Sequence, residues 1–332
     1  MGMILKNKKF EILFLIFPFW IPLLYFGLIN AFPSSRIQIF TLFVLILGET
    51  HFAATWLFFT LPANREWSRR NWKTIYMLPI IILIPYFCFS FAFPNYGAVL
   101  GSIFSSVHVT RQSIGVIRLY RSKRNGFEEK SIYFFSAIFI IIGGLRFIAP
   151  NHLNGLLNIS NLQINFFVKV LCIICTLVVI QIFLKTQSLE LKLATVTGIL
   201  LYSPYLVVSD ASDAVAMGVG MHWCQYLTLI YKIYLDSKSK NSVDIQDERY
   251  FAKKVNSRFI KILFISIYAI FTTSIITKLG TTFQWKASVL ALPLSLQAFH
   301  YYLDAFIWKF SDPDIRVNIG SRLFKSKSQK IN

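Results

Sequence analysis

Apolar runs of about 20 residues recur along almost the whole chain, and they restrict its fold more than any other feature. They extend from residue 10 to residue 310, and only short basic loops separate them. A helix needs roughly 20 apolar residues to cross a bilayer. We therefore expect an all-α, polytopic transmembrane bundle in a single integral membrane domain, residues 1–332. Its ten expected spans are 10–32, 38–61, 74–93, 96–119, 131–150, 164–184, 191–209, 212–235, 259–277 and 284–309.

Composition agrees with a membrane protein. Only 15% of the residues are charged, whereas soluble domains average about a quarter. The first run follows Lys6, Lys8 and Lys9 as a signal peptide would, but 10–32 is longer than a signal core of roughly 7–15 residues. We expect a retained first helix.

The basic residues predict the orientation of the spans. The net charge is +19. With ten spans, 28 of the 34 Lys and Arg residues fall in the two tails and in the loops on the same side of the membrane as the tails. Cytoplasmic loops of membrane proteins are enriched in this way. We expect a multi-pass protein of the cell membrane with both termini in the cytoplasm, in contact with the lipid bilayer and with no nucleic-acid partner. The exceptions to the pattern are Arg36, Arg111, Arg146, Lys169, Lys278 and Lys286.

Four of the five histidines lie inside expected spans, one on each of four helices that run in the same direction. They are His51, His108, His222 and His300. Counting to the cytoplasmic boundary gives nine to eleven residues for each of them, so all four lie roughly 15 Å above that boundary at 1.5 Å per residue.

A single buried histidine is usually structural, but four at one depth are harder to explain in that way. Ionisable groups in mid-membrane are candidates for functional sites, and imidazole is the commonest transition-metal ligand. Four of them suit iron, copper or zinc. We expect a metal site, provided that the four helices face one another.

Polar residues next to these histidines suit a surrounding hydrogen-bonding layer. Residues three and four positions away share a helical face, which places Asp304 beside His300. Arg111 needs a partner, and Glu49 and Asp304 are the deep carboxylates. A structural ion pair and a role in the site both remain open. The full set of expected supporting residues is Glu49, Arg111, Gln112, Gln225, Tyr226 and Asp304.

Other polar residues have simpler explanations. His152 and the pair Asp210 and Asp213 lie in outer loops, where solvated side chains are expected. Cys172 and Cys175 form a CxxC sequence, but inside a span, where cysteines usually pack as small apolar side chains.

The histidine motifs resemble those of the Brp/Blh family of membrane-bound β-carotene 15,15'-dioxygenases. The similar segments are His-Phe-Ala-Ala-Thr from His51, His-Val-Thr-Arg-Gln from His108, Met-His-Trp-Cys-Gln-Tyr around His222, and Phe-His-Tyr-Tyr-Leu-Asp around His300. The resemblance covers roughly residues 45 to 312. It implies that the four histidines bind Fe(2+). The family's glycine and aspartate are missing after His51, and Tyr226 replaces its second paired histidine.

These observations favour a non-haem iron oxygenase that acts on an apolar lipid or a carotenoid-like substrate with O2. Both the substrate and O2 partition into hydrocarbon, where a dry pocket protects reactive species from water. Three alternatives stay open: another transition metal, a haem b electron-transfer protein, and a transporter or structural membrane protein with interhelical histidine contacts.

Overall fold

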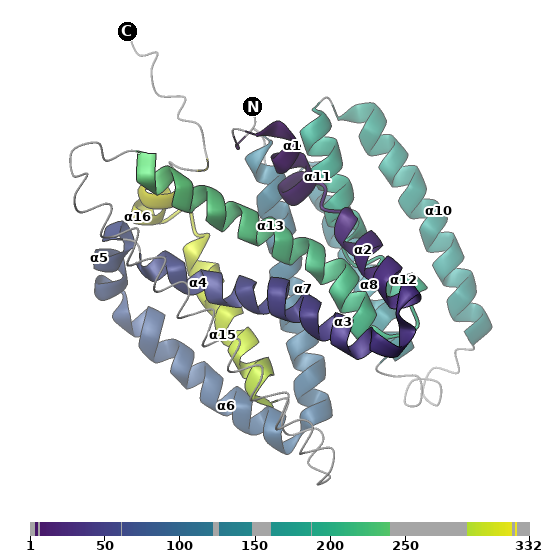
Figure 1. Cartoon of the computed structure of the whole chain (residues 1–332), viewed down its shortest axis with the longest axis horizontal. Helices are drawn as coiled ribbons and strands as arrows, with labels where there is room; N and C mark the ends of the chain where they lie inside the picture. Colours follow the sequence, from purple (N-terminus) through teal and green to yellow (C-terminus); the bar gives the residue numbers. More distant parts are fainter. Residues whose placement is uncertain are drawn as a thin grey trace. The chain divides into compact units, whose positions relative to one another are not determined.

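The structure of the chain is a computed structural model, shown in Figure 1. It describes residues 4–5, 7–60, 62–121, 126–147, 161–186, 188–239, 291–320 and 323. Within these residues every regular element is a helix, so the expected all-α class is confirmed. The predicted span 259–277, the start of the span 284–309 and His152 lie outside the described residues.

The helices form two compact units. Unit 1 comprises Met1–Val44 and Ser106–Tyr226, and unit 2 comprises Leu45–Ser105 and Leu227–Asn332. The division falls inside two long helices, α7 (Pro94–Leu119) and α13 (Ala211–Ser239). The expectation of a single membrane domain stays a prediction.

Unit 1 contains most of the N-terminal and central helices. The break between η1 and α2 contains Pro18, η2 and α12 each begin with a proline, and the long helices α8 and α10 are continuous. With the parts of α7 and α13 named above, its elements are α1 (Lys8–Glu11), η1 (Ile12–Ile16), α2 (Trp20–Ala31), η2 (Pro33–Ser35), α3 (Arg36–Phe43), α8 (Phe127–Phe147), α10 (Asn161–Lys185), α11 (Leu189–Leu200) and α12 (Pro204–Val207).

Prolines interrupt two of the predicted spans. The first span breaks after Ile16, and its two halves meet at 65°. Pro18 lies in the break and has no N–H for a helical hydrogen bond. The span 191–209 is likewise divided, and α12 begins at Pro204, the first helical turn where proline is tolerated.

Close helix contacts hold unit 1 together where glycine removes a side chain. A Cβ at Gly198 on α11 would lie 2.6 Å from Cδ1 of Ile132 on α8. A Cβ at Gly218 on α13 would collide with the backbone carbonyl oxygen of Leu201. Gly198 therefore makes room for the side chain of Ile132, and Gly218 lets α13 lie against the backbone at Leu201.

Unit 2 is built around α15, which packs against α6 and α4. The hydroxyl of Tyr302 on α15 donates to the carbonyl oxygen of Thr74 at 3.1 Å, which ties α15 to η4. With its parts of α7 and α13, its elements are η3 (Val44–Glu49), α4 (Thr50–Thr60), α5 (Pro62–Arg70), η4 (Lys73–Met77), α6 (Leu78–Ala92), α15 (Ala291–Ile307), α16 (Pro313–Ile315) and η6 (Arg316–Gly320).

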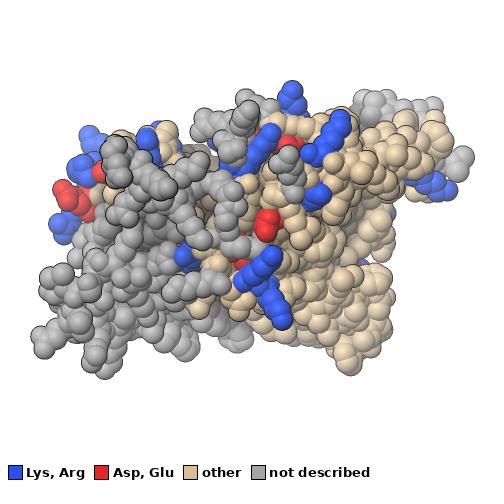
Figure 2. Space-filling view, turned by 90° about the horizontal axis from the view of Figure 1, so that it is seen from above, with Lys and Arg blue, Asp and Glu red and all other residues tan. Residues whose placement is uncertain are grey.

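Two helices among the described residues are long and apolar enough to cross a membrane, and this indicates membrane association. They are Lys73–Ala92 and Asn165–Lys185, and the bent pair Lys8–Ile16 with Trp20–Ala31 would make a third. Both carry outward-facing large apolar side chains, such as Ile81 on α6 and Ile173 on α10. Charged side chains are sparse on the described surface in Figure 2.

The helix boundaries follow most of the predicted spans closely, although the count of ten stays a prediction. The span 96–119 corresponds to α7 at Pro94–Leu119, and 212–235 to α13 at Ala211–Ser239. The remaining described helices are shorter or more polar than the two candidate spans.

Candidate metal site

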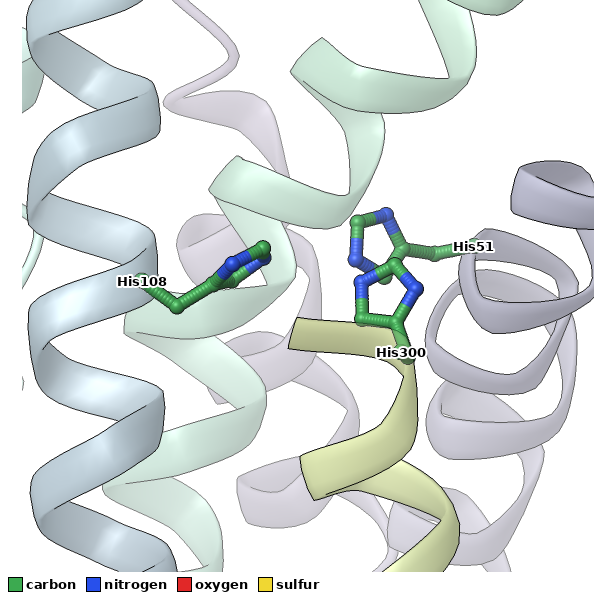
Figure 3. Close-up of side chains that lie close together, drawn as sticks. All are labelled: His51, His108 and His300. Carbon is green, nitrogen blue, oxygen red and sulfur yellow. The ribbon is translucent and has the colours of Figure 1, made fainter. Parts of the chain in front are cut away.

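Unit 2 brings two of the four predicted ligands into contact. His51 on α4 and His300 on α15 have their ring centroids 4.5 Å apart, with the rings inclined at 68° (Figure 3). Each offers a ring nitrogen, and these two nitrogens lie within 4.8 Å of each other. Both side chains are almost fully buried. Two residues that are 249 positions apart in the chain therefore form a buried imidazole pair.

A hydroxyl group and a carboxylate position His300. Oγ1 of Thr55 lies 2.7 Å from Nδ1 of His300 and donates to Oδ1 of Asp304 at 3.3 Å. The tautomer of the ring sets which of these two atoms donates. Nε2, the other ring nitrogen of His300, lies 3.6 Å from Oδ2 of Asp304. Metal-bound histidines are commonly oriented in this way through their other nitrogen.

The helix geometry explains how Thr55 and Asp304 reach the pair. Each lies four residues after a histidine, Thr55 after His51 and Asp304 after His300, so each shares a face with its histidine. The ring of Phe52, the residue after His51, lies beside His300, with the two ring centroids 4.8 Å apart. Thr55 was not among the predicted supporting residues, although its spacing from His51 is a signal that the sequence contains.

Unit 1 brings the other two predicted ligands together. His108 on α7 and His222 on α13 have ring centroids 5.7 Å apart, and their rings are nearly perpendicular, at 89°. His222 is buried and His108 is half-buried. The pair resembles the one in unit 2 in its edge-to-face arrangement.

Hydrogen bonds to backbone carbonyls hold the helix of His222 in place. Nε2 of Gln225 donates to the carbonyl oxygen of Leu15 at 2.8 Å, and Sγ of Cys224 donates to that of Phe14 at 3.4 Å. Both bonds join α13 to η1. Gln225 was predicted to support the metal ligands, and the structure shows this helix-anchoring contact for it.

The other predicted supporting residues lie in different surroundings. Glu49 ends η3 two residues before His51 and is half-buried, Gln112 on α7 is half-buried, and Tyr226 on α13 is buried. The side chain of Arg111 is exposed within unit 1. An ion pair of Arg111 with Glu49 or Asp304 stays a prediction.

Two acidic residues have roles that the sequence did not predict. Asp213 was expected as a solvated turn residue, but it is buried. Its carboxylate accepts hydrogen bonds from Tyr25 at 2.7 Å and from Arg36, which replace the water it loses. Glu11 is buried too. It accepts from the backbone N–H of Ile4 and Leu5 and from the hydroxyl of Tyr120 at 2.6 Å.

The chemistry of the two pairs suits a transition metal. Neutral imidazole is a ligand for iron, copper and zinc, and ligand nitrogens on one ion are typically roughly 3–4 Å apart, given metal–nitrogen bonds of about 2.0–2.1 Å. The nitrogen separation of under 4.8 Å in the His51–His300 pair is close to this range. A small movement of either ring would allow both to bind one ion.

No protein-family model matches the chain, no curated protein matches it, and no solved structure matches it.

Proposed function

We propose that this protein is a multi-pass membrane enzyme that binds one transition-metal ion, Fe(2+) in the first instance, through His51, His108, His222 and His300. It uses the ion to oxygenate an apolar lipid or carotenoid-like substrate with O2. The observation that carries the proposal is the arrangement of these histidines, three of them buried and His108 half-buried, in two edge-to-face pairs with ring centroids 4.5 and 5.7 Å apart.

The number of ligands that a metal needs supports a single ion. Catalytic metals in proteins usually have at least three protein ligands, and each pair offers two. The sequence predicts the four histidines at one depth, nine to eleven residues from the cytoplasmic boundary. A four-histidine site satisfies both observations.

Polar contacts within the units support the proposed ten spans with both termini in the cytoplasm. In unit 1, segments predicted to be cytoplasmic meet one another, since Tyr120 bonds Glu11 and Arg118 pairs with Glu129. The predicted outer segments also meet, through Arg36 and Asp213. In unit 2, Trp67 donates to Asp312 at 3.1 Å, and both are predicted to be cytoplasmic.

The surroundings of the histidines suit oxygenation chemistry. Bound iron would supply the activation of O2. The chain itself supplies burial that keeps water away from the imidazoles, and the Thr55–Asp304 contact that fixes the ring of His300. Water exclusion strengthens electrostatic interactions in such a site and protects reactive species.

One observation favours a second candidate, a membrane protein without a metal in which the histidines join helices. Thr55 lies at hydrogen-bonding distance from His300, and the two come from different helices. Such a contact stabilises helix packing by itself. The haem b alternative is less well supported, because two axial imidazoles need room for a macrocycle between them, and the members of each pair are in edge-to-face contact.

Co-expression with a β-carotene pathway tests the oxygenase proposal. Retinal formation with loss of pigment is expected if the substrate is a carotenoid, and the His300→Ala variant should leave the pigment intact. If β-carotene is unchanged, oxygen uptake by membranes supplied with other polyenes or unsaturated lipids is measured next. No histidine-dependent oxygen uptake with any of these substrates would contradict the proposal.

A further inference from the structure

A half-open cleft lies in unit 1, and neither His108 nor His222 is among the residues that line it. Its volume is about 540 Å³, within the range of roughly 300–1,000 Å³ that is typical of small-molecule sites. All of its lining residues belong to α2, η2, the start of α3, the end of α12 and the segment after it, and the first half of α13. These segments lie at the predicted outer ends of their spans.

The walls of the cleft are mostly apolar and accessible. They include Phe26, Ile29, Val207 and Met217. Val207 is 71% exposed and Phe26 is 51% exposed. Such an exposed apolar wall suits an acyl chain, because apolar side chains and hydrocarbon make many small dispersion contacts when they pack together.

A fixed cation lies at one side of the cleft. The side chain of Arg36 lines it and is 43% exposed, and one of its terminal nitrogens pairs with the buried carboxylate of Asp213. A guanidinium has five N–H donors, so Arg36 keeps donors for a ligand. Tyr25 holds Asp213 from the other side. The hydrogen bond to Asp213 also raises the pKa of Arg36, so the group stays charged.

The charges around Arg36 decide which headgroup fits. Asp213 neutralises Arg36. Asp210 lies next to these groups, because it follows Ser209, which lines the cleft, and its Oδ1 accepts from the backbone N–H of Asp213 at 3.3 Å. Asp210 is exposed, and its Oδ1 accepts from the backbone N–H of Ser212 at 2.8 Å. A plain anion would meet a net negative group of charges. A headgroup with a phosphate and an ammonium would satisfy Arg36 and Asp210 together.

We propose that this cleft binds a zwitterionic phospholipid, with its phosphate on Arg36, its ammonium near Asp210 and an acyl chain along Phe26 and Val207. The proposal depends on the membrane location and not on metal binding. It assigns the outer end of unit 1 a lipid-binding role.

Lipid binding to the purified full-length protein in a neutral detergent tests the proposal. The protein is titrated with dihexanoyl phosphatidylethanolamine, dihexanoyl phosphatidylglycerol and inorganic phosphate, and the affinity is obtained from the rise in unfolding temperature. We expect phosphatidylethanolamine to bind about tenfold more tightly than the other two, since one charge-assisted hydrogen bond corresponds to about that factor.

Three variants separate the parts of the site. Arg36→Gln should weaken binding of both lipids about tenfold. Asp210→Asn keeps a good helix cap and should remove the preference for phosphatidylethanolamine over phosphatidylglycerol. Ile29→Trp fills the cleft without changing the ion pair and should weaken the binding of both lipids. This variant tests the proposal even if Arg36→Gln fails to fold. Arg70→Gln and Glu66→Gln, exposed residues of unit 2, are the matched controls.

Three results would overturn the proposal. They are tighter binding of phosphatidylglycerol than of phosphatidylethanolamine, equal binding of inorganic phosphate, and unchanged lipid affinity in Ile29→Trp.

Discussion

Thr55 and His300 are joined across two helices of unit 2, with Oγ1 of Thr55 2.7 Å from Nδ1 of His300. The same hydroxyl donates to Asp304 at 3.3 Å, so one side chain links the imidazole to a buried carboxylate. This link fixes the ring orientation of His300. A hydroxyl in this position serves both the packing of α4 on α15 and the metal site.

Thr55→Val removes this hydroxyl with almost no change of shape. We expect a loss of about 1–3 kcal/mol in unfolding free energy, because Asp304 and His300 lose a buried partner. Metal affinity should fall roughly 10–100-fold, as is usual when an orienting group is removed. Thr55→Ser keeps the hydroxyl and should retain both properties. Unfolding in detergent and metal titration measure the two effects; unchanged metal affinity in Thr55→Val would contradict the orienting role.

Tyr120→Phe tests the buried contact with Glu11 at the predicted cytoplasmic end of unit 1. Burial and, next, the carboxylate of Glu11 raise the pKa of Tyr120 above its usual value of 10.0. The folded protein therefore holds this proton more tightly than the unfolded chain, and the stabilisation is complete below about pH 10 and lost as the pH rises further.

The variant should lose about 1–3 kcal/mol at neutral pH, because Glu11 loses a donor. Its stability should also fall less steeply above pH 10 than that of the wild-type protein. Unfolding temperatures measured between pH 7 and pH 11 check both points. Parallel curves for the two proteins would show that Tyr120 does not contribute through its proton.

Two glycine substitutions should have opposite effects. Gly218→Ala places a Cβ against the backbone carbonyl of Leu201, which cannot rotate away, whereas nothing lies within 4 Å of a Cβ at Gly115 on α7. We expect Gly218→Ala to destabilise the protein by more than about 1 kcal/mol through overpacking. Gly115→Ala should be neutral or stabilising by up to roughly 1 kcal/mol. Equal unfolding temperatures for the two variants would be inconsistent with the close contact of α13 and Leu201.

Single cysteines introduced into a cysteine-free background test the proposed orientation. Ser34 and Arg69 are both exposed and lie at predicted opposite sides of the membrane. Ser34→Cys should react with an impermeant maleimide added outside intact cells, and Arg69→Cys only after the membrane is opened. The cysteine-free chain is the control. Labelling of both positions from outside would refute the span between them.

The sequence predicted many of the described helices because short loops bound the apolar runs, basic on the predicted cytoplasmic side and containing proline or other polar residues on the outer side. The helix α7 at Pro94–Leu119 differs from the predicted span 96–119 by two residues at one end. The break at Pro18 was missed, since an apolar run continues through it, and only the missing N–H of proline indicates a bend.

The site was predicted in part. The depth count identified the four histidines, and the structure pairs His51 with His300 and His108 with His222. Which helix contacts which depends on packing between segments far apart in the chain, and a single sequence does not contain that information. The burial of Asp213 was missed for the same reason: its partners Tyr25 and Arg36 lie nearly 190 and 180 residues away.

The central claim is most directly tested by elemental analysis of the protein purified in detergent without added metal. We predict one transition-metal ion per chain, with iron the most abundant, and a loss of at least half of it in each of His51→Ala, His108→Ala, His222→Ala and His300→Ala. His152→Ala, a histidine predicted to lie in an outer loop, should keep its metal. Absence of metal from the wild-type protein, or equal metal content in all five variants, would contradict the account.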